Sequence, residues 1–244
     1  MRLLGAPLMH PGVSRRGNNR EICSIIGCTR SGPSFRTYTG RHWHPLDPDP
    51  WQIHAVDIAR SHAFTCRFGG HLEDFYSDAQ HCVLVCEALR QLGAEEQREG
   101  LLHEVAEAYS GFGDVTTVKL DEAVRACVKP IERSIDDCAS VRFGLPIGFA
   151  EGSTTKNADH LLLAAEDRDL RGLDAIAEHG RVSAWPALDA EWRWLRWFQY
   201  LFPDDRDRND VAARLFVLRP RVSWAGRSLA HPFEAGRAPE QVRR

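Results

Sequence analysis

Four residues of the types that bind transition metals stand out in this chain of 244 residues: His81, His103, Glu104 and Asp159. Two imidazoles and two carboxylates can together hold one divalent transition metal and leave coordination positions for water and a substrate. Each of the four lies in an apolar stretch with helical periodicity, where burial of such a group without a partner costs several kcal/mol. The sequence therefore predicts a site for one divalent metal, with Co, Mn, Zn, Fe and Ni as the candidates.

The spacing around the His-Glu doublet adds a candidate acid. In GLLHEVAEAY, His103 and Glu107 lie four residues apart and project from the same helix face. Glu104 is rotated by about 100 degrees from His103 on a regular helix, so one ion reaches both only beside the helix. The segment also looks like the zinc-peptidase pattern HExxH, but that pattern needs a second histidine where this chain has Glu107. We therefore reject a peptidase function.

The phrases that surround these residues resemble the HD-domain superfamily of metal-dependent phosphohydrolases, and within it the bacterial and phage group around the 5'-deoxynucleotidases. The family pattern is an early histidine, a His-Asp doublet in a phrase like LLHDAxEAYxGD, and a later Lys-x-Ala-Asp. This chain has His81, then LLHEVAEAY, then KNAD at 156–159. The resemblance extends over roughly residues 36 to 170, and taken together its motifs are specific.

Carried over residue by residue, the resemblance implies that His81, His103, Glu104 and Asp159 are the metal ligands. It implies that Glu107, one turn after the doublet, is the catalytic acid. One departure from the family pattern is that Glu104 stands where the family has aspartate. Its additional methylene lengthens the ligand, which could shift or weaken the metal.

The resemblance also implies residues that contact the substrate. Arg67 would hold the phosphate and Phe68 would lie beside the nucleoside. Asp114 and Lys119 would belong to a catalytic loop that closes over sugar and phosphate. An alternative for Arg67 is a purely structural ion pair with an acid such as Glu73. The loop sequence GFGDVTTVK lacks the prolines of the family's GDxPxPxK, so substrate choice is the part of the resemblance that transfers least directly.

The implied reaction is metal-dependent hydrolysis of a phosphate ester or anhydride. We expect a nucleotide substrate, and first a 5'-deoxynucleoside monophosphate. Two alternatives stay open: hydrolysis of (deoxy)nucleoside triphosphates, and an HD-like protein that binds nucleotides without turnover. Related two-metal enzymes place further histidines between the doublet and the last aspartate, whereas this chain has none from Val105 to Ala158. A single metal is therefore favoured.

Composition excludes several other classes of protein. The formal net charge is −3, with 31 Lys and Arg against 34 Asp and Glu, which argues against binding to long nucleic acids. The chain has seven cysteines without a repeating spacing, which indicates free thiols in a reducing compartment. It has no apolar run near the roughly 20 residues that span a membrane. We expect a cytoplasmic protein.

Helical periodicity predicts an all-α fold, an HD-domain helical bundle with a less regular N-terminal arm and a C-terminal extension. The predicted helices cover 53–64, 75–93, 95–111, 120–144, 154–170 and 186–203, with Pro130 kinking or dividing the fourth. A short strand is expected within 214–224. The predicted division is a disordered leader over 1–36, an HD phosphohydrolase core over 37–170, and a helical extension with a frayed tail over 171–244.

The segment from Leu188 to Phe202 is apolar nearly all round, with several tryptophans. A helix of this kind is buried in its own domain or meets a partner chain. Because large exposed apolar patches mark interfaces, and two-fold homodimers are the commonest soluble oligomers, we expect a homodimer through this helix. The alternative is that residues 203–233 fold back and cover the same surface.

Overall fold

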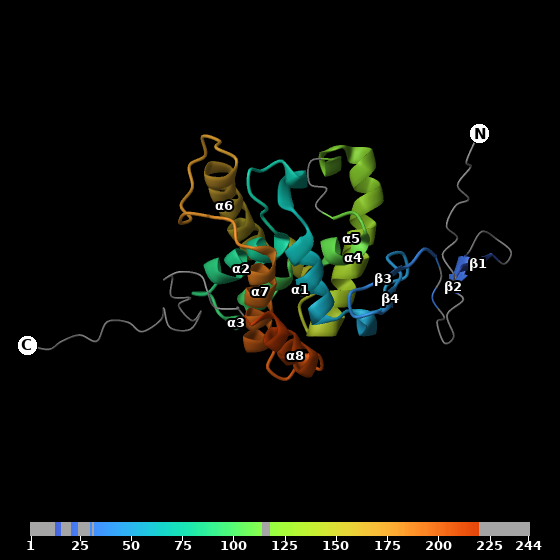
Figure 1. Ribbon diagram of the computed structural model, residues 1–244. Helices are drawn as coiled ribbons and strands as arrows, with labels where there is room; N and C mark the ends of the chain where they lie inside the picture. The colour runs from blue at the N-terminus through green and yellow to red at the C-terminus, as the bar shows by residue number, and fades with distance from the viewer. Residues whose placement is uncertain (1–12, 16–20, 24–29, 31, 114–117, 220–244) are drawn as a thin grey trace, which may run out of the picture.

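The computed structural model describes residues 13–15, 21–23, 30, 32–113 and 118–219. Most of the predicted leader and the predicted frayed tail from residue 220 therefore lie outside the described residues. Within these ranges the fold is all-α, as the sequence predicts, and strands are confined to two short hairpins (Figure 1).

The helices are labelled in Figure 1, and their connections range from two residues between α3 and α4 to sixteen between α6 and α7. Their bounds are α1 Ala55–Phe64, α2 Asp78–Ala88, α3 Ala94–Leu102, α4 Val105–Ser110, α5 Glu122–Phe143, α6 Ser153–Leu170, α7 Ala187–Leu201 and α8 Arg208–Leu218. The antiparallel hairpins pair β1 Val13–Arg15 with β2 Glu21–Cys23, and β3 Phe35–Arg36 with β4 His42–Trp43. In this view α5 and α6 lie on opposite sides of the bundle, with α1 and α7 between them.

Two predictions about individual elements need correction. Helix α5 continues over Pro130 as one element, so division at this proline is wrong, whereas a kink there stays a prediction. The strand expected within 214–224 is wrong for its described part, because residues 214–218 form the end of α8. A short apolar run fits a strand or a buried helix equally well. Packing of α8 against α7 and α1 decides for the helix here.

The main hydrophobic core surrounds α1, which packs against α2, α4 and α7. Trp43 of the N-terminal arm is buried in this core, and its indole Nε1 donates a hydrogen bond to the backbone carbonyl of Tyr109 at 2.7 Å. The two rings also lie 4.4 Å apart, centroid to centroid. This contact fixes the arm to the end of α4, close to the predicted site.

Helix α7 contributes its large apolar side chains to the same core. Trp194, Trp197 and Phe198 are all at most 3% exposed. Helix α8 adds Val211 and Leu215 to this cluster. The surface on which the homodimer prediction rests is thus largely covered within the chain itself. The homodimer stays a prediction.

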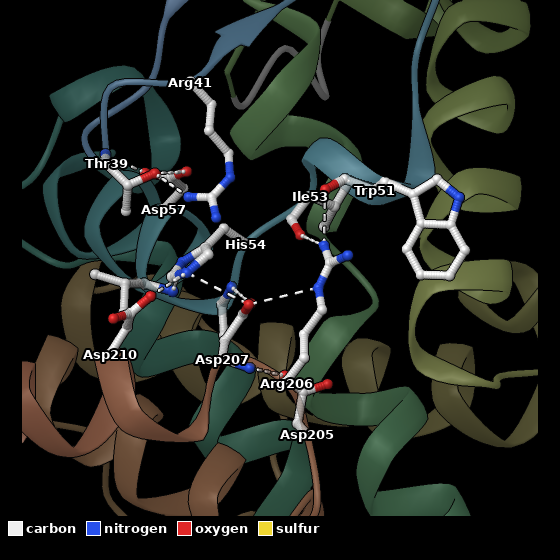
Figure 2. Close-up of polar contacts among 12 residues, drawn as sticks. Thr39, Arg41, Trp51, Ile53, His54, Asp57, Asp205, Arg206, Asp207 and Asp210 are labelled. Carbon is white, nitrogen blue, oxygen red and sulfur yellow. Dashed lines mark hydrogen bonds and ion pairs between the residues drawn. The ribbon is translucent and has the colours of Figure 1, made fainter.

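The start of α1 is tied to the turn before α8 (Figure 2). Asp207 accepts a hydrogen bond from the amide of Ala55 at 2.8 Å, at the positive end of the helix. The buried His54 accepts from the amide two residues later through Nδ1 at 3.2 Å, so its Nε2 donates to Asp210 at 3.0 Å. Arg206 donates to two backbone carbonyls just before α1. The C-terminal helices therefore help to set the first turn of α1.

A second, smaller cluster docks α6 onto α2. Val85 of α2 and Leu89, the residue directly after that helix, pack with Ala158, Leu162 and Ala165 of α6. These α6 residues recur at helical spacing and are at most 7% exposed. They hold one face of α6 against α2, and the acidic residues of that helix are positioned by this apolar seam.

Two predictions from composition concern the described residues. Among these, the free cysteines are Cys66, Cys82, Cys86, Cys127 and Cys138. None of the described helices combines the length and the apolar character that a membrane crossing requires.

Candidate metal centre

The four predicted metal ligands meet at one point of the bundle. His81 lies on α2, Asp159 lies on α6, and His103 and Glu104 lie between α3 and α4. One ligand atom from each residue falls within 4.8 Å of all the others. Both histidines are at most 4% exposed. This cluster could hold a metal ion.

The separations between the ligand atoms suit a single ion. His81 Nε2 lies 3.2 Å from His103 Nε2 and 3.2 Å from Asp159 Oδ1. His103 Nε2 lies 3.4 Å from Glu104 Oε1. Nitrogen and oxygen ligands bind transition metals at about 2.0–2.2 Å. Neighbouring ligands at tetrahedral or octahedral angles are then about 3.0–3.5 Å apart, which matches these distances.

The prediction of a single helix over 95–111 is wrong, because the helix is interrupted at the His103-Glu104 doublet. Helix α3 ends at Leu102, and α4 begins only at Val105. Glu104 has φ −101° and ψ 14°, outside the regular helical range. Periodicity alone could not reveal this break, since the apolar spacing continues across it. The backbone at Glu104 thus departs from a regular helix, and the ligand atoms of His103 and Glu104 lie within 4.8 Å of each other.

Gly100 allows α3 to approach α2 closely at this place. A Cβ atom there would lie 2.6 Å from Leu89 Cδ1 and 3.4 Å from the Cα of Cys86. The carbonyl of Gly100 accepts a hydrogen bond from His103 Nδ1 at 2.8 Å. That bond leaves Nε2 of His103 for a metal, the usual arrangement for a ligating histidine.

The other histidine is oriented by a residue that the sequence did not single out. Glu166, fully buried on α6, accepts a hydrogen bond from His81 Nδ1 at 2.6 Å. Nε2 of His81 therefore faces His103 and Asp159. Glu166 follows Asp159 by seven residues, two helical turns, so both carboxylates lie on one face of α6. That spacing was the available signal.

Charge is strongly coupled in this cluster. Burial and the nearby Arg67 act to lower the pKa of His81, but Glu166 and Asp159 outweigh them and raise it to about 9. Burial acts to raise the pKa of Asp159, but its contact with His81 holds that pKa below its ordinary value. These opposite shifts favour a proton shared between His81 and Asp159, whose atoms lie 3.2 Å apart. A metal ion must displace this proton when it binds.

Arg67 points into the cluster from the turn that precedes α2. Its side chain lies 3.4 Å from Glu166, 3.6 Å from Asp78 and 3.9 Å from Glu104. Burial lowers the pKa of this guanidinium, yet the carboxylates more than compensate and raise it. The arginine therefore stays charged next to the proposed ligands. Its predicted role as a phosphate-binding residue remains a prediction.

Phe68 adopts a left-handed backbone conformation, with φ 57° and ψ 28°. Such a conformation is unfavourable for a residue with a side chain and is frequent at functional sites. The ring lies 5.6 Å from the guanidinium carbon of Arg67 and 5.0 Å from that of Arg171. The structure thus places the two predicted substrate-contacting residues Arg67 and Phe68 side by side.

Glu107 lies on α4 and is 8% exposed. Lys119 Nζ lies 3.9 Å from its carboxylate and 2.9 Å from that of Glu132 on α5. The structure thus brings Lys119 to the predicted catalytic acid. Asp114, the other predicted residue of this loop, lies outside the described residues. Glu132 was not predicted, although a buried acid in an amphipathic helix is a signal of its own.

One turn after Glu132, Asp136 is a second buried acid that the sequence analysis missed. Its Oδ1 has no hydrogen-bond partner among the described residues. Burial, with the nearby charges of Glu104 and Glu132, raises the pKa of Asp136 to about 8. The folded protein thus binds this proton more tightly than the unfolded chain does.

We predict that Asp136→Asn stabilises the metal-free protein at alkaline pH. Because the folded-state pKa is raised, stability falls as pH increases from about 4 to about 8, and an amide has no proton to lose. The melting temperature of the variant should exceed that of the parent by about 3 °C or more near pH 8, since about 1 kcal/mol shifts a protein of this size by 2–4 °C. Near pH 4 the variant and the parent should have the same melting temperature. A difference that is equal at both pH values would contradict the assignment.

Comparisons with known proteins place the chain among bacterial relatives. No protein-family model matches it. It is 35% identical over 155 residues to the uncharacterized protein YfdR of Escherichia coli strain K12, a match that covers 64% of this chain and 78% of YfdR. It is 33% identical over 165 residues to an uncharacterized protein of Rhodobacter capsulatus, with 57% of this chain and 83% of the relative covered. The chain therefore belongs to the same protein family as YfdR of Escherichia coli.

Proposed function

We propose that this protein is a single-metal HD-domain phosphohydrolase that acts on nucleotides, and first on 5'-deoxynucleoside monophosphates. The observation that carries the proposal is the convergence of His81, His103, Glu104 and Asp159, whose ligand atoms lie within 4.8 Å of one another. Two neutral imidazoles and two carboxylates are a donor set for Zn, Mn, Fe, Co or Ni. The order of these residues along the chain is the one that the HD family uses.

A divalent metal in this cluster would supply Lewis acidity to a phosphoryl oxygen and to a water molecule. The residues of the chain divide the remaining tasks. The carboxylates of Glu104 and Asp159 balance the charge of the ion. Glu107 would take or give a proton at the attacking water or the leaving oxygen. Its partner Lys119 is 15% exposed and lies 3.9 Å away, where it can offset the charge of a phosphate.

Arg67 supports the proposal through its buried charge, whereas an arginine that only binds phosphate would lie exposed to solvent. It is 7% exposed and surrounded by carboxylates. A buried cation in this place reduces the repulsion among the acids that must lie together around the metal. A phosphate that reaches the metal would add its negative charge to the same cluster, and the guanidinium would then face it as well.

The test is a hydrolysis screen of the purified full chain with 5'-deoxynucleoside mono- and triphosphates and with Co²⁺, Mn²⁺, Zn²⁺, Ni²⁺ or Fe²⁺. We expect orthophosphate from monophosphates, and loss of this activity with a chelator. Release of triphosphate or pyrophosphate from triphosphates would favour the alternative substrate class. Metal and nucleotide binding without any hydrolysis would indicate a non-catalytic HD-like protein and contradict the proposal.

A further inference from the structure

Glu166 is the only fully buried carboxylate of α6 among the described residues, and it contacts three different polar side chains. Its Oε1 accepts hydrogen bonds from His81 Nδ1 at 2.6 Å and from the hydroxyl of Tyr76 at 2.7 Å. Its Oε2 lies 3.4 Å from Nε of Arg67. A charged carboxylate in such a position costs considerable desolvation free energy. Its contacts must compensate for that cost.

The contact with His81 is the closest of the three. Oε2 of Glu166 has no hydrogen bond among the described residues, although Arg67 is near. The arginine thus provides charge, whereas the hydrogen bonds of Glu166 go to the histidine and to Tyr76. Tyr76 is itself 0% exposed and can donate its hydroxyl hydrogen only inside the protein. Two buried hydrogen bonds therefore link Tyr76 through Glu166 to His81, a proposed metal ligand.

We propose that Glu166, held in place by Tyr76, is a positioning residue that sets the metal affinity of this centre through His81. By accepting the hydrogen of Nδ1, it fixes the ring so that Nε2 faces His103 and Asp159. A carboxylate in that place also makes the imidazole a stronger donor to a metal. The inference rests on the metal centre of the proposed function, but it does not depend on which substrate is hydrolysed.

Glu166 has a matched control in the next residue of the same helix. Asp167 is also acidic, but it is partly exposed and pairs with Arg171 at 2.7 Å on the surface. Asp167→Asn therefore removes one negative charge from the same turn of α6 without touching His81. Comparing it with Glu166→Gln separates a specific effect on His81 from a general effect of charge or of helix stability.

The experiment is titration of the metal-free full chain with Co²⁺, followed by calorimetry and by the visible absorption of the bound ion. We expect Glu166→Gln to raise the Kd by about 10- to 100-fold, the usual effect of removing such a partner. The Co²⁺ spectrum should also change, because the ring of His81 is held less firmly. Asp167→Asn should bind Co²⁺ with the parent Kd and spectrum.

Tyr76→Phe provides a second variant that keeps the shape of the core. It should weaken Co²⁺ binding by a smaller factor, because Glu166 loses one of its two hydrogen-bond donors. In the double variant with Glu166→Gln, the effects should be strongly non-additive, since both residues act along one chain of contacts. Full additivity would mean that Tyr76 acts independently of Glu166, and would overturn this part of the inference.

The remaining outcomes distinguish the inference from the proposed function. Unchanged Co²⁺ affinity in Glu166→Gln, with normal binding by the parent, would overturn the positioning role alone. Equal weakening by Glu166→Gln and Asp167→Asn would show a general loosening of α6 and would also overturn it. A parent chain that binds no Co²⁺ would contradict the metal centre and the inference together.

Discussion

Replacement of His103 by alanine should abolish both metal binding and phosphate release, while the helices remain folded. In the proposed centre His103 would supply one of two imidazole ligands, and its Nε2 lies 3.2 Å from that of His81. Only three ligands would remain, two of them carboxylates, and the affinity for a transition metal would fall steeply. Elemental analysis of the purified variant measures the metal, and circular dichroism measures the helix content.

His160→Ala is the matched control for this variant. His160 directly follows the ligand Asp159 on α6, but its side chain is exposed. The control should keep the metal content and the hydrolysis rate of the parent. A His103→Ala protein that is folded and carries the parent amount of metal would exclude the assigned site.

Glu107→Gln should reduce kcat by about 100-fold or more and leave the metal in place. Removing a proton-transfer group typically has an effect of this size. The amide retains the shape of the side chain but cannot take a proton, and Glu107 is not one of the four clustered ligands. In this variant steady-state kinetics should show a lower kcat while the metal content stays that of the parent. In His103→Ala both should be lost.

The control here is Glu95→Gln, an exposed acid in the first turn of α3. It should hydrolyse substrate at the parent rate. A Glu107→Gln variant with the parent kcat would mean that this carboxylate only holds Lys119, and that the role implied by the family resemblance does not apply. Loss of metal from the variant would instead place Glu107 in the metal site.

The helices were predictable because apolar residues recur with helical spacing and because Gly and Pro mark the ends of several segments. Helices α1, α2, α5 and α7 lie within the predicted ranges, and α6 begins one residue before its range. The break at Glu104 was not predictable in this way. Helix α3 also packs closely against α2 around Gly100, and tertiary contacts of this kind leave no trace in the apolar period.

The cluster that could hold a metal ion was predictable for a different reason. His81, His103 and Asp159 are polar residues within apolar helical stretches, so the sequence itself marks them as unusual. Glu166 and Asp136 escaped notice because each lies among other acids, where an exposed position is the ordinary expectation. Only the folded chain shows that these two carboxylates face inward.

Helix α6 carries both the ligand Asp159 and Glu166, the acid that orients a ligand of another helix. Occupation of the proposed centre and docking of α6 onto α2 are therefore thermodynamically linked, and each favours the other by the same free energy. Val85 and Leu162 of the apolar seam are not among the four clustered residues, yet a substitution that weakens the seam should raise the dissociation constant of a bound ion. The seam would then act as an allosteric element of the proposed centre.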